Sequence, residues 1–331
     1  MIETQVHSRN IVDWAADKPE AVVLSGDLTG STEIAAFKAA YPERFFSLGM
    51  AEQNMLSWAG GMAREGFVPY LHTFSVFLVR RPYDQLAMSV AYPNLPVKLV
   101  GFLPGIMTPG GVSHQAIEDI SLMRGLPNMT VLEVGDAADV ESVLDVAHAV
   151  DGPVYIRMLR GALPRLFDTP MELDRVRHLA DGEDVTLFSA GITTEEAIRA
   201  RHVLEAAGIS VTHRHVTTHK PFDDPAIADA IRAAGSLVVT VENHSVIGGL
   251  GSEVAERMAE IGAGTRLVRI GIPDTFAQGA SAPYLMDKFG LTAPRIVERI
   301  GAELGRHIPV PDDLGSHDVT IDVGAEQLEA L

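Results

Sequence analysis

The sequence contains no cysteine, and this absence excludes several kinds of protein. Without thiols the chain cannot form a disulfide framework, bind a metal through thiolates or use a cysteine nucleophile. Basic residues are also scarce: 26 lysines and arginines stand against 44 acidic residues, which gives a formal net charge of −18. Such a charge argues against a nucleic-acid backbone or an anionic membrane surface as a partner.

Long apolar runs are missing as well. None approaches the roughly 20 residues that a membrane-spanning helix needs, and no charged segment followed by an apolar stretch marks a signal peptide at the N-terminus. The 331 residues are 47% hydrophobic and 21% charged, which is typical of a globular protein with room for two domains. We therefore expect a soluble, cytoplasmic protein.

Short apolar segments alternate with helical segments along the chain, which predicts a mostly parallel sheet with helices on both faces. The predicted strands are Ala21–Ser25, Phe45–Leu48, Phe67–Leu71, Val97–Phe102, Met129–Val134, Val154–Met158, Val185–Ser189, Ser210–Val216, Leu237–Glu242 and Arg266–Ile270. The helices that we expect between them include 51–65, 77–90 and 115–124. Thr193 or Thr194 is expected to cap the helix that ends near Ala207.

One segment, Leu166 to Asp184, interrupts this alternation because it contains Pro170, scattered acids and no apolar period. The sequence therefore predicts an α/β fold of two α/β domains, the second smaller than the first. Their expected bounds are 1–168 and 184–308, with a linker at 169–183 and a weakly structured tail at 309–331.

Familiar glycine and histidine motifs identify no cofactor. The stretch Gly248-Gly-Leu-Gly251 resembles a dinucleotide-binding loop, but it lacks the full spacing and a distal acid. Neither a Walker loop nor a nucleophile elbow is present. His213 and His215 alternate along a predicted strand, so we expect them at surface or cleft positions and not in a metal site.

Two junctions between a strand and a helix carry candidate chemistry. Glu52 follows the predicted strand 45–48 and begins a helix, and ligands collect at the carboxyl ends of strands in α/β sheets. The alternative is that Glu52 only stabilises the first helical turn. The second junction is the long loop that ends at His114, where a histidine can donate to a substrate oxygen or move a proton. Its alternative is a flexible loop whose histidine caps a helix.

Several stretches, taken in order, resemble the C-terminal half of a transketolase. They are Gly49-Met-Ala-Glu-Gln-Asn54, Thr73-Phe-Ser-Val-Phe77, Ser89-Val-Ala-Tyr-Pro-Asn-Leu95, Ser113-His-Gln-Ala-Ile-Glu-Asp-Ile120, Leu126-Pro-Asn-Met129 and Glu242-Asn-His244 with Gly248-Gly-Leu-Gly251. The resemblance extends from about Ala21 to Ile300. It implies a pyrimidine-binding domain followed by the C-terminal domain of the family, as in one chain of a split, two-subunit transketolase.

The resemblance implies a thiamine diphosphate site and gives Glu52 a catalytic role in it. In that family a glutamate hydrogen-bonds a ring nitrogen of the aminopyrimidine and activates the cofactor. Phe77 is expected to stack on the pyrimidine. The other expected cofactor-binding residues are Met50, Phe74 and Arg80, of which Arg80 stands where a tyrosine is often found.

The resemblance also implies substrate contacts. His114 is expected to act on the hydroxyl or carbonyl region of the donor, and Ser31 and Arg160 to hold a sugar phosphate. The chain departs from the family at two further positions, since Gly110 replaces an aspartate that reads a sugar hydroxyl and Phe102 stands where a phosphate-side histidine is found. These departures imply a donor other than xylulose 5-phosphate, one that is shorter, differently configured or modified.

One family motif is absent. Magnesium diphosphate is bound there through Gly-Asp-Gly and a later asparagine, whereas this chain has Gly26-Asp-Leu28. The resemblance therefore implies that a second chain binds Mg²⁺ and the diphosphate, in a heterotetramer of carbohydrate metabolism. The implied reaction is transfer of a two-carbon ketol unit from a ketose. The alternatives are a beta-type subunit of a 2-oxoacid decarboxylating dehydrogenase, a fragment similar to 1-deoxyxylulose-phosphate synthase, and a scaffold without catalysis.

Overall fold

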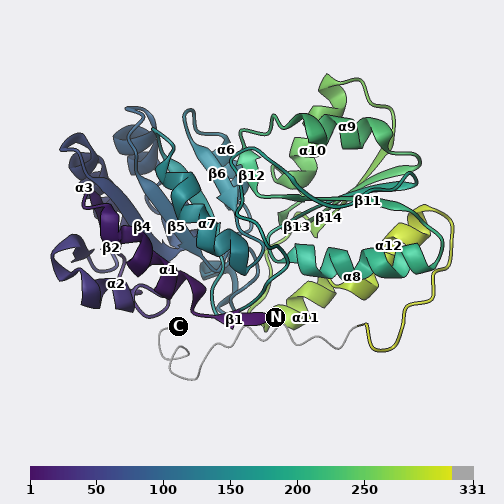
Figure 1. Ribbon diagram of the computed structural model, residues 1–331, viewed down its shortest axis with the longest axis horizontal. Helices are drawn as coiled ribbons and strands as arrows, with labels where there is room; N and C mark the ends of the chain where they lie inside the picture. The colour runs from purple at the N-terminus through teal and green to yellow at the C-terminus, as the bar shows by residue number, and fades with distance from the viewer. Residues whose placement is uncertain (315–331) are drawn as a thin grey trace.

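The computed structural model describes residues 1–314, which form two α/β domains lying side by side (Figure 1). Of the expected tail, 309–331, only residues 309–314 fall within this range. No helix of the described residues is long and apolar enough to cross a membrane. The α/β class predicted from the sequence is confirmed, and each predicted strand has a counterpart in the structure.

The first domain is built on a seven-stranded sheet in which every neighbouring pair is parallel except β12 with β6. Its strands, in spatial order, are β12 (Thr218–Lys220), β6 (Thr130–Glu133), β7 (Val154–Met158), β5 (Lys98–Phe102), β4 (Val68–Phe74), β2 (Ala21–Ser25) and β3 (Phe45–Ser47). A small antiparallel pair, β1 (Ile2–Thr4) and β8 (Ala162–Pro164), lies beside it.

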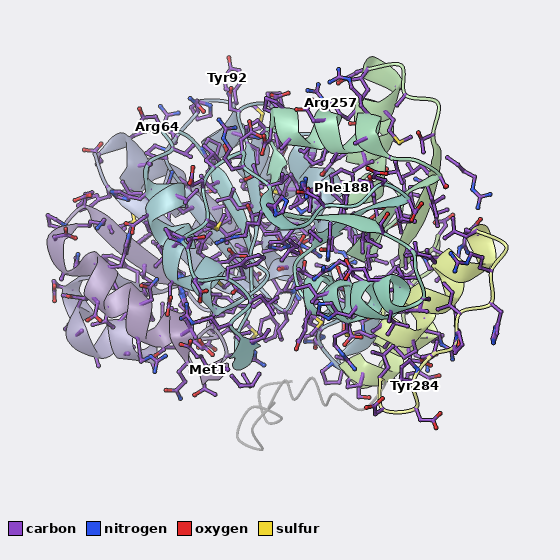
Figure 2. All side chains as sticks on the ribbon, turned by 45° about the vertical axis from the view of Figure 1, so that its right-hand side comes forward. Met1, Arg64, Tyr92, Phe188, Arg257 and Tyr284 are labelled. Atoms are coloured by element: carbon purple, nitrogen blue, oxygen red, sulfur yellow. The ribbon has the colours of Figure 1, made fainter. Side chains whose placement is uncertain are left out.

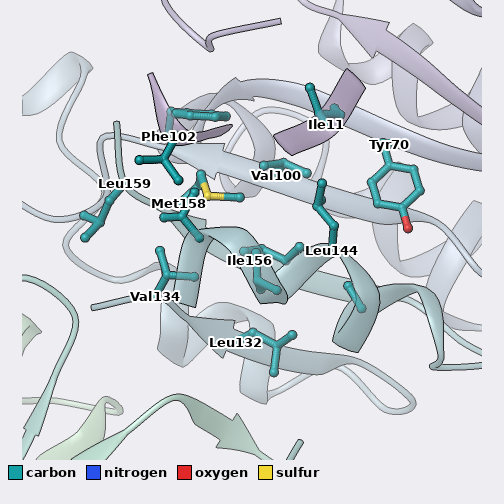
Figure 3. Close-up of a cluster of buried hydrophobic side chains, with 14 of the residues drawn as sticks. Ile11, Tyr70, Val100, Phe102, Leu132, Val134, Leu144, Ile156, Met158 and Leu159 are labelled. Atoms are coloured by element: carbon teal, nitrogen blue, oxygen red, sulfur yellow. The ribbon is translucent and has the colours of Figure 1, made fainter. Parts of the chain in front are cut away.

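Helices cover both faces of this sheet because successive strand residues point to opposite sides. Val23 joins one buried cluster, shown in part in Figure 3, while Val22 and Leu24 join another. The first cluster includes residues of α1 (Val6–Trp14), α2 (Ala35–Ala40) and α7 (Ala137–His148). The second includes residues of α3 (Glu52–Arg64), α4 (Ser75–Val79), a π-helical segment (Leu86–Ala91) and α6 (Asp119–Arg124).

The second domain is smaller and repeats this layered plan around five strands. In spatial order they are β14 (Arg266–Ile272), β13 (Leu237–Ser245), β10 (Val185–Ala190), β11 (Val211–Val216) and β9 (Arg177–Ala180), of which β9 is antiparallel. One core contains α8 (Thr193–Ala206), α11 (Ala282–Lys288) and α12 (Ala293–Glu303); the other contains α9 (Pro225–Ala233) and α10 (Leu250–Glu260). Strand β9 lies inside the segment that the sequence predicts as a linker.

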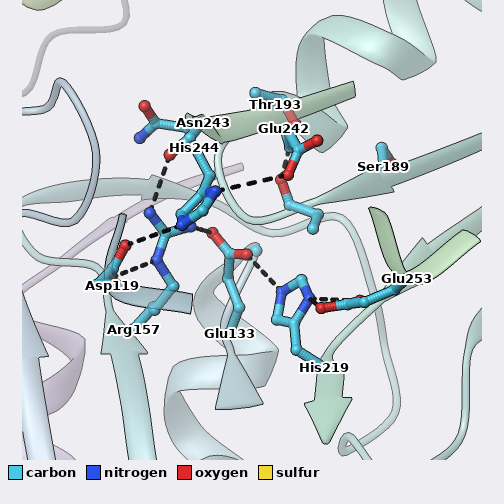
Figure 4. Close-up of polar contacts among 12 residues, drawn as sticks. Asp119, Glu133, Arg157, Ser189, Thr193, His219, Glu242, Asn243, His244 and Glu253 are labelled. Atoms are coloured by element: carbon cyan, nitrogen blue, oxygen red, sulfur yellow. Dashed lines mark hydrogen bonds and ion pairs between the residues drawn. The ribbon is translucent and has the colours of Figure 1, made fainter. Parts of the chain in front are cut away.

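Buried charges connect the two domains (Figure 4). Arg157 of β7 donates to Asp119 at 2.8 Å, to Glu133 at 2.5 Å and to the carbonyl oxygen of Asn243 in the second domain at 2.9 Å. His219 lies between Glu133 and Glu253, with nitrogen–oxygen distances of 2.8 and 3.0 Å. Arg157 and His219 therefore each have partners of opposite sign, and loss of such partners would leave a buried charge uncompensated.

Some helices differ from the predictions. The helix expected at 77–90 is interrupted after Val79, and helix α5 (Tyr83–Gln85) and the π-helical segment follow, because Pro82 cannot donate a helical hydrogen bond. The helix expected at 115–124 begins only at Asp119, since the Gln115 side chain donates to the carbonyl oxygen of Thr108 at 3.1 Å and holds the loop. Strand β1 and helix α1 precede the first predicted element.

The expectation for His213 and His215 is wrong, because both are fully buried. His213 pairs with the hydroxyl of Ser189 at 2.9 Å, and His215 pairs with Thr194 at 2.7 Å and with Asp139 of the first domain at 3.1 Å. The capping prediction is wrong as well. Helix α8 has no side-chain cap, and both threonine hydroxyls are used inside the protein.

Candidate active site

The site residues expected from the sequence gather at one edge of the first sheet, where the parallel strands end. They come from segments that directly follow five strands. Ser31 follows β2, Glu52 follows β3, Phe74 and Phe77 lie at and after the end of β4, His114 follows β5, and Arg160 follows β7. This edge is where α/β sheets place their ligands.

Glu52 begins helix α3 after a tight turn. Gly49 has a φ of +70°, a left-handed conformation that a glycine adopts without strain. The Glu52 side chain is only 4% exposed, and its Oε1 accepts a hydrogen bond of 2.9 Å from Nη1 of Arg81. A surface hollow of about 520 Å³ opens beside this pair, lined by Met50, Ala51, Glu52, Gln53, Asn54 and Arg81.

Two aromatic rings, those of Phe74 and Phe77, form the next part of the site. Phe74 and Phe77 stack with centroids 5.8 Å apart and an interplanar angle of 25°. Phe74 is buried in the core, whereas Phe77 is only partly buried. The guanidinium of Arg81 lies 4.2 Å from the centroid of Phe77, within the range of a cation–π contact. Phe77 is therefore the more accessible of the two rings.

His114 reaches the same rings from the loop after β5. Its ring meets Phe77 edge-on at 5.4 Å between centroids, and its Nδ1 lies 2.8 Å from the Ser113 hydroxyl. Gly110 makes room for this histidine, because a Cβ at that position would lie 2.8 Å from Cγ of His114. The glycine that replaces the expected aspartate is thus required by the observed position of the His114 ring.

The two neighbouring arginines of this region have different partners. Arg80, which the sequence assigns to the cofactor, pairs with Glu118 and donates to the carbonyl oxygens of Val112 at 2.8 Å and Gln115 at 3.0 Å. It therefore ties the His114 loop to α4. Arg81 lies against Glu52 and Phe77 but is absent from the expected set. Its spacing of four residues after Phe77 is the signal that could have indicated it.

Arg160 and Ser31 lie together at the far side of Phe74. Nη1 of Arg160 donates to the carbonyl oxygen of Ser31 at 2.8 Å, and its guanidinium is 5.9 Å from the Phe74 centroid. Burial lowers the pKa of Arg160, an effect that the nearby carboxylate of Glu33 partly offsets. The structure thus brings both expected phosphate residues into contact with each other and places Arg160 beside the aromatic pair.

Two other positions that the sequence singles out lie within the protein. Phe102 is fully buried against His7, with ring centroids 5.5 Å apart. In the second domain the glycine loop before α10 is filled from within, since Glu242 accepts a hydrogen bond of 2.9 Å from the backbone of Gly251. Burial raises the pKa of Glu242 to about 8, although the backbone bonds oppose this. A carboxyl group of the protein itself therefore occupies that helix start.

Comparison with known families agrees with this geometry. The family described as "Transketolase, pyrimidine binding domain" matches residues 4–165, and "Transketolase, C-terminal domain" matches residues 174–296. A relative named 6-deoxy-6-sulfo-D-fructose transketolase subunit SqwH, from a Clostridium species, is 40% identical over 87% of this chain and 89% of its own. The chain belongs to the transketolase family.

Two further comparisons show how this transketolase-family chain relates to longer and shorter members. A solved structure titled "Split gene transketolase, inactive beta4 tetramer" is 39% identical, with a TM-score of 0.83, over 91% of this chain and 97% of that one. The 1-deoxy-D-xylulose-5-phosphate synthase of Chlorobium phaeovibrioides is 33% identical over 89% of this chain, which spans only 47% of that enzyme.

Proposed function

We propose that this chain is the pyrimidine-domain subunit of a split, thiamine diphosphate-dependent transketolase. The observation that carries the proposal is that Arg81 contacts both Glu52, a buried carboxylate after a parallel strand, and the flat ring of Phe77, so the acid and the ring border the same space. An aminopyrimidine needs these two features: an acid at a ring nitrogen and an aromatic face for stacking. The residues present therefore fit the cofactor.

Each side chain of the site has a role in this account. When bound, thiamine diphosphate supplies the electron sink for ketol transfer, and the protein positions and tunes it. Glu52 holds a proton between its carboxyl oxygen and the pyrimidine nitrogen, and Phe77 fixes the plane of the ring. His114, next to Phe77, donates to an oxygen of the donor ketose or moves its proton. Arg160 and Ser31 hold the anionic end of the donor.

A second chain completes the site. The hollow beside Glu52 is open, and apolar side chains are exposed on α3, which lines it, and on the π-helical segment that packs on α3, among them Trp58 and Met88. Tyr92, which follows that segment, is 80% exposed and projects from the molecule (Figure 2). Gly60 of α3 packs on the backbone of Ser89, so the two elements form one surface. We assign to the partner the binding of Mg²⁺ and diphosphate, in a heterotetramer.

The similarity to a 1-deoxy-D-xylulose-5-phosphate synthase supports a second candidate, a ketol synthase with a 2-oxoacid as donor. The two functions differ in the donor that is consumed. A ketose donor implies transfer of a two-carbon unit, whereas a 2-oxoacid donor implies release of carbon dioxide. The relative that acts on a sulfonated sugar extends the first candidate to donors whose anionic group is not a phosphate.

A donor screen with the reconstituted pair tests the proposal. Phosphorylated, sulfonated and uncharged ketoses, and pyruvate as the alternative donor, are each incubated with one aldehyde acceptor, Mg²⁺ and thiamine diphosphate. We expect a ketol product from an anionic ketose without release of carbon dioxide. If pyruvate is the only donor that gives product, the second candidate is favoured. If the pair turns over none of the donors, the assignment of an enzyme is overturned.

A further inference from the structure

We propose that Arg81 is a placeholder for the aminopyrimidine, occupying its site until the cofactor displaces it. This inference rests on the proposed function and goes beyond it, because it gives a role to a residue that neither the sequence motifs nor the comparisons assign. The guanidinium makes at once the two contacts that the pyrimidine ring would make, one with Glu52 and one with Phe77.

The chemical match is close. A guanidinium is planar and donates N–H groups to a carboxylate, and it stacks on aromatic faces. A protonated aminopyrimidine is likewise planar and also donates N–H groups from its ring nitrogen and its amino group. Arg81 donates to Oε1 of Glu52 at 2.9 Å and lies 4.2 Å from the centre of Phe77. Both groups cannot occupy the same face of Phe77 and the same carboxylate oxygen.

The pair is also asymmetric in its exposure. The Glu52 side chain is 4% exposed and the Arg81 side chain is 52% exposed, so the guanidinium reaches the acid from the solvent side. The backbone of Arg81 is held, since Gln53 donates to its carbonyl oxygen at 3.3 Å. The side chain can therefore swing outwards while its backbone stays in place. Among the residues that the structure describes, Arg81 is the one hydrogen-bond partner of the Glu52 side chain, so this arginine supplies the positive charge that a buried carboxylate needs.

Arg80 serves as the internal comparison. Its guanidinium is engaged by Glu118 and by two carbonyl oxygens of the His114 loop, and it makes no contact with Glu52. Of the two adjacent arginines, one therefore holds a loop and the other holds the cofactor position. The placeholder keeps Glu52 compensated in the unloaded chain at a cost in cofactor affinity.

The affinity of the reconstituted pair for thiamine diphosphate tests this inference, measured by calorimetry with Mg²⁺ present. Since binding no longer has to break the ion pair, Arg81→Ala should tighten binding about five- to tenfold. The matched control is Arg232→Ala, which removes an exposed arginine paired with Asp229 in the second domain and should leave the affinity unchanged. Unchanged or weaker binding by Arg81→Ala would overturn the inference alone, whereas no binding by any variant would overturn the proposed function with it.

A second readout needs no turnover. It is an NMR measurement on the chain labelled with ¹⁵N-arginine. The Nε–H signal of Arg81 is the one that disappears in the variant Arg81→Lys. We expect restricted guanidinium rotation in the unloaded chain, and faster rotation both in Glu52→Gln and in the cofactor-loaded pair. If rotation is already fast in the unloaded chain, or stays slow after loading, Arg81 does not give way to the cofactor.

Discussion

The acid at position 52 is placed by three features of individual residues. Gly49 makes the left-handed turn after β3, helix α3 starts at Glu52, and the side chain of Glu52 is buried and paired with Arg81. An acid at a helix start is commonplace. Burial beside an exposed arginine is not needed for helix stability, and it is this burial that supports a role in cofactor activation.

Replacing Glu52 by Gln keeps the shape of the side chain and removes its proton-sharing carboxylate. We expect activity of the reconstituted pair to fall about 10²- to 10⁴-fold, the range for loss of a proton-transfer group. Exchange of the reactive cofactor proton with solvent should slow in parallel. Glu65→Gln, at the exposed end of the same helix, is the control and should be active. Equal exchange rates in Glu52→Gln and the unaltered chain would remove Glu52 from the mechanism.

Gly110 offers a second test at this scale. Its added Cβ would lie 2.8–2.9 Å from atoms of His114, so Gly110→Ala must displace the ring. We expect kcat/KM to fall on the order of 10- to 100-fold because a shift of about 1 Å disturbs donor positioning. The melting temperature should hardly change, since Gly110 itself is exposed. Gly264→Ala, with open space around its Cβ, is the matched control; full activity in Gly110→Ala would show that the position of His114 is not critical.

At the scale of elements, most of the site follows from the alternation of strands and helices. The order of apolar segments places Ser31, Glu52, Phe77, His114 and Arg160 after strands of one sheet. Parallel pairing then brings those ends together. The spacing of Arg81 from Phe77 is the one available signal, but helix α4 ends at Val79 and both Arg80 and Arg81 come after it. Local spacing alone does not decide which of them faces the acid.

The buried histidines show a different limit of sequence reasoning. His215 alternates with polar neighbours as a half-exposed strand residue would, yet it pairs with Asp139, 76 positions away in the chain. Likewise, His219 meets Glu133 from 86 positions away. The first pair depends on how the two domains dock and the second on the addition of β12 to the sheet of the first domain, and no local period reports either. The sequence therefore predicts the fold of each domain but not the network of buried charges between the domains.

His219 makes the junction between the domains sensitive to pH. Although burial alone lowers its pKa, the carboxylates of Glu253 and Glu133 raise the pKa of His219 to about 10. A raised pKa in the folded state contributes stability that is fully present below pH 6.5 and is lost as the pH rises towards 10. Burial of Lys98, which lowers its pKa to about 7, acts in the opposite direction over part of this range.

The comparison of variants isolates this contribution. His219→Gln should lower the free energy of unfolding by about 3 kcal/mol at pH 6.5, the lower end of the range for breaking a buried ion pair, because Glu133 keeps Arg157 and Glu253 keeps Arg124 as a partner. The difference from the unaltered chain should shrink as the pH approaches 10, which thermal melts from pH 6 to 10 would show. His178→Gln removes an exposed histidine paired with Asp181 and should have little effect. A difference independent of pH would contradict the assigned charge of His219.

At the scale of the whole molecule, the first domain presents a site that is open on one side. Helix α3, which starts at Glu52, exposes Trp58, and the π-helical segment packed on α3 and the residue after it expose Met88 and Tyr92, so large apolar groups lie on this side of the domain. The related structure titled an inactive beta4 tetramer shows that a similar chain assembles without activity. Both observations support an active site that two kinds of chain share.

Tyr92 tests the assembly surface. Tyr92→Glu places a charge on that surface, so it should raise the dissociation constant of the assembled pair at least about tenfold. The fold itself should be unaffected because the side chain is exposed. Tyr284→Glu, on an exposed position of α11 in the second domain, is the control. Sedimentation of each variant with the partner chain measures the effect, and identical assembly by both variants would place the interface elsewhere.

Mixing the two chains tests the central claim most directly. Ketol transfer is measured with thiamine diphosphate and Mg²⁺ for this chain alone, for the partner alone and for their mixture. We expect activity only in the mixture, rising to saturation at an equal ratio of the two chains and lost when this chain carries Glu52→Gln. Tight cofactor binding and turnover by this chain alone would contradict the claim that two kinds of chain share the active site.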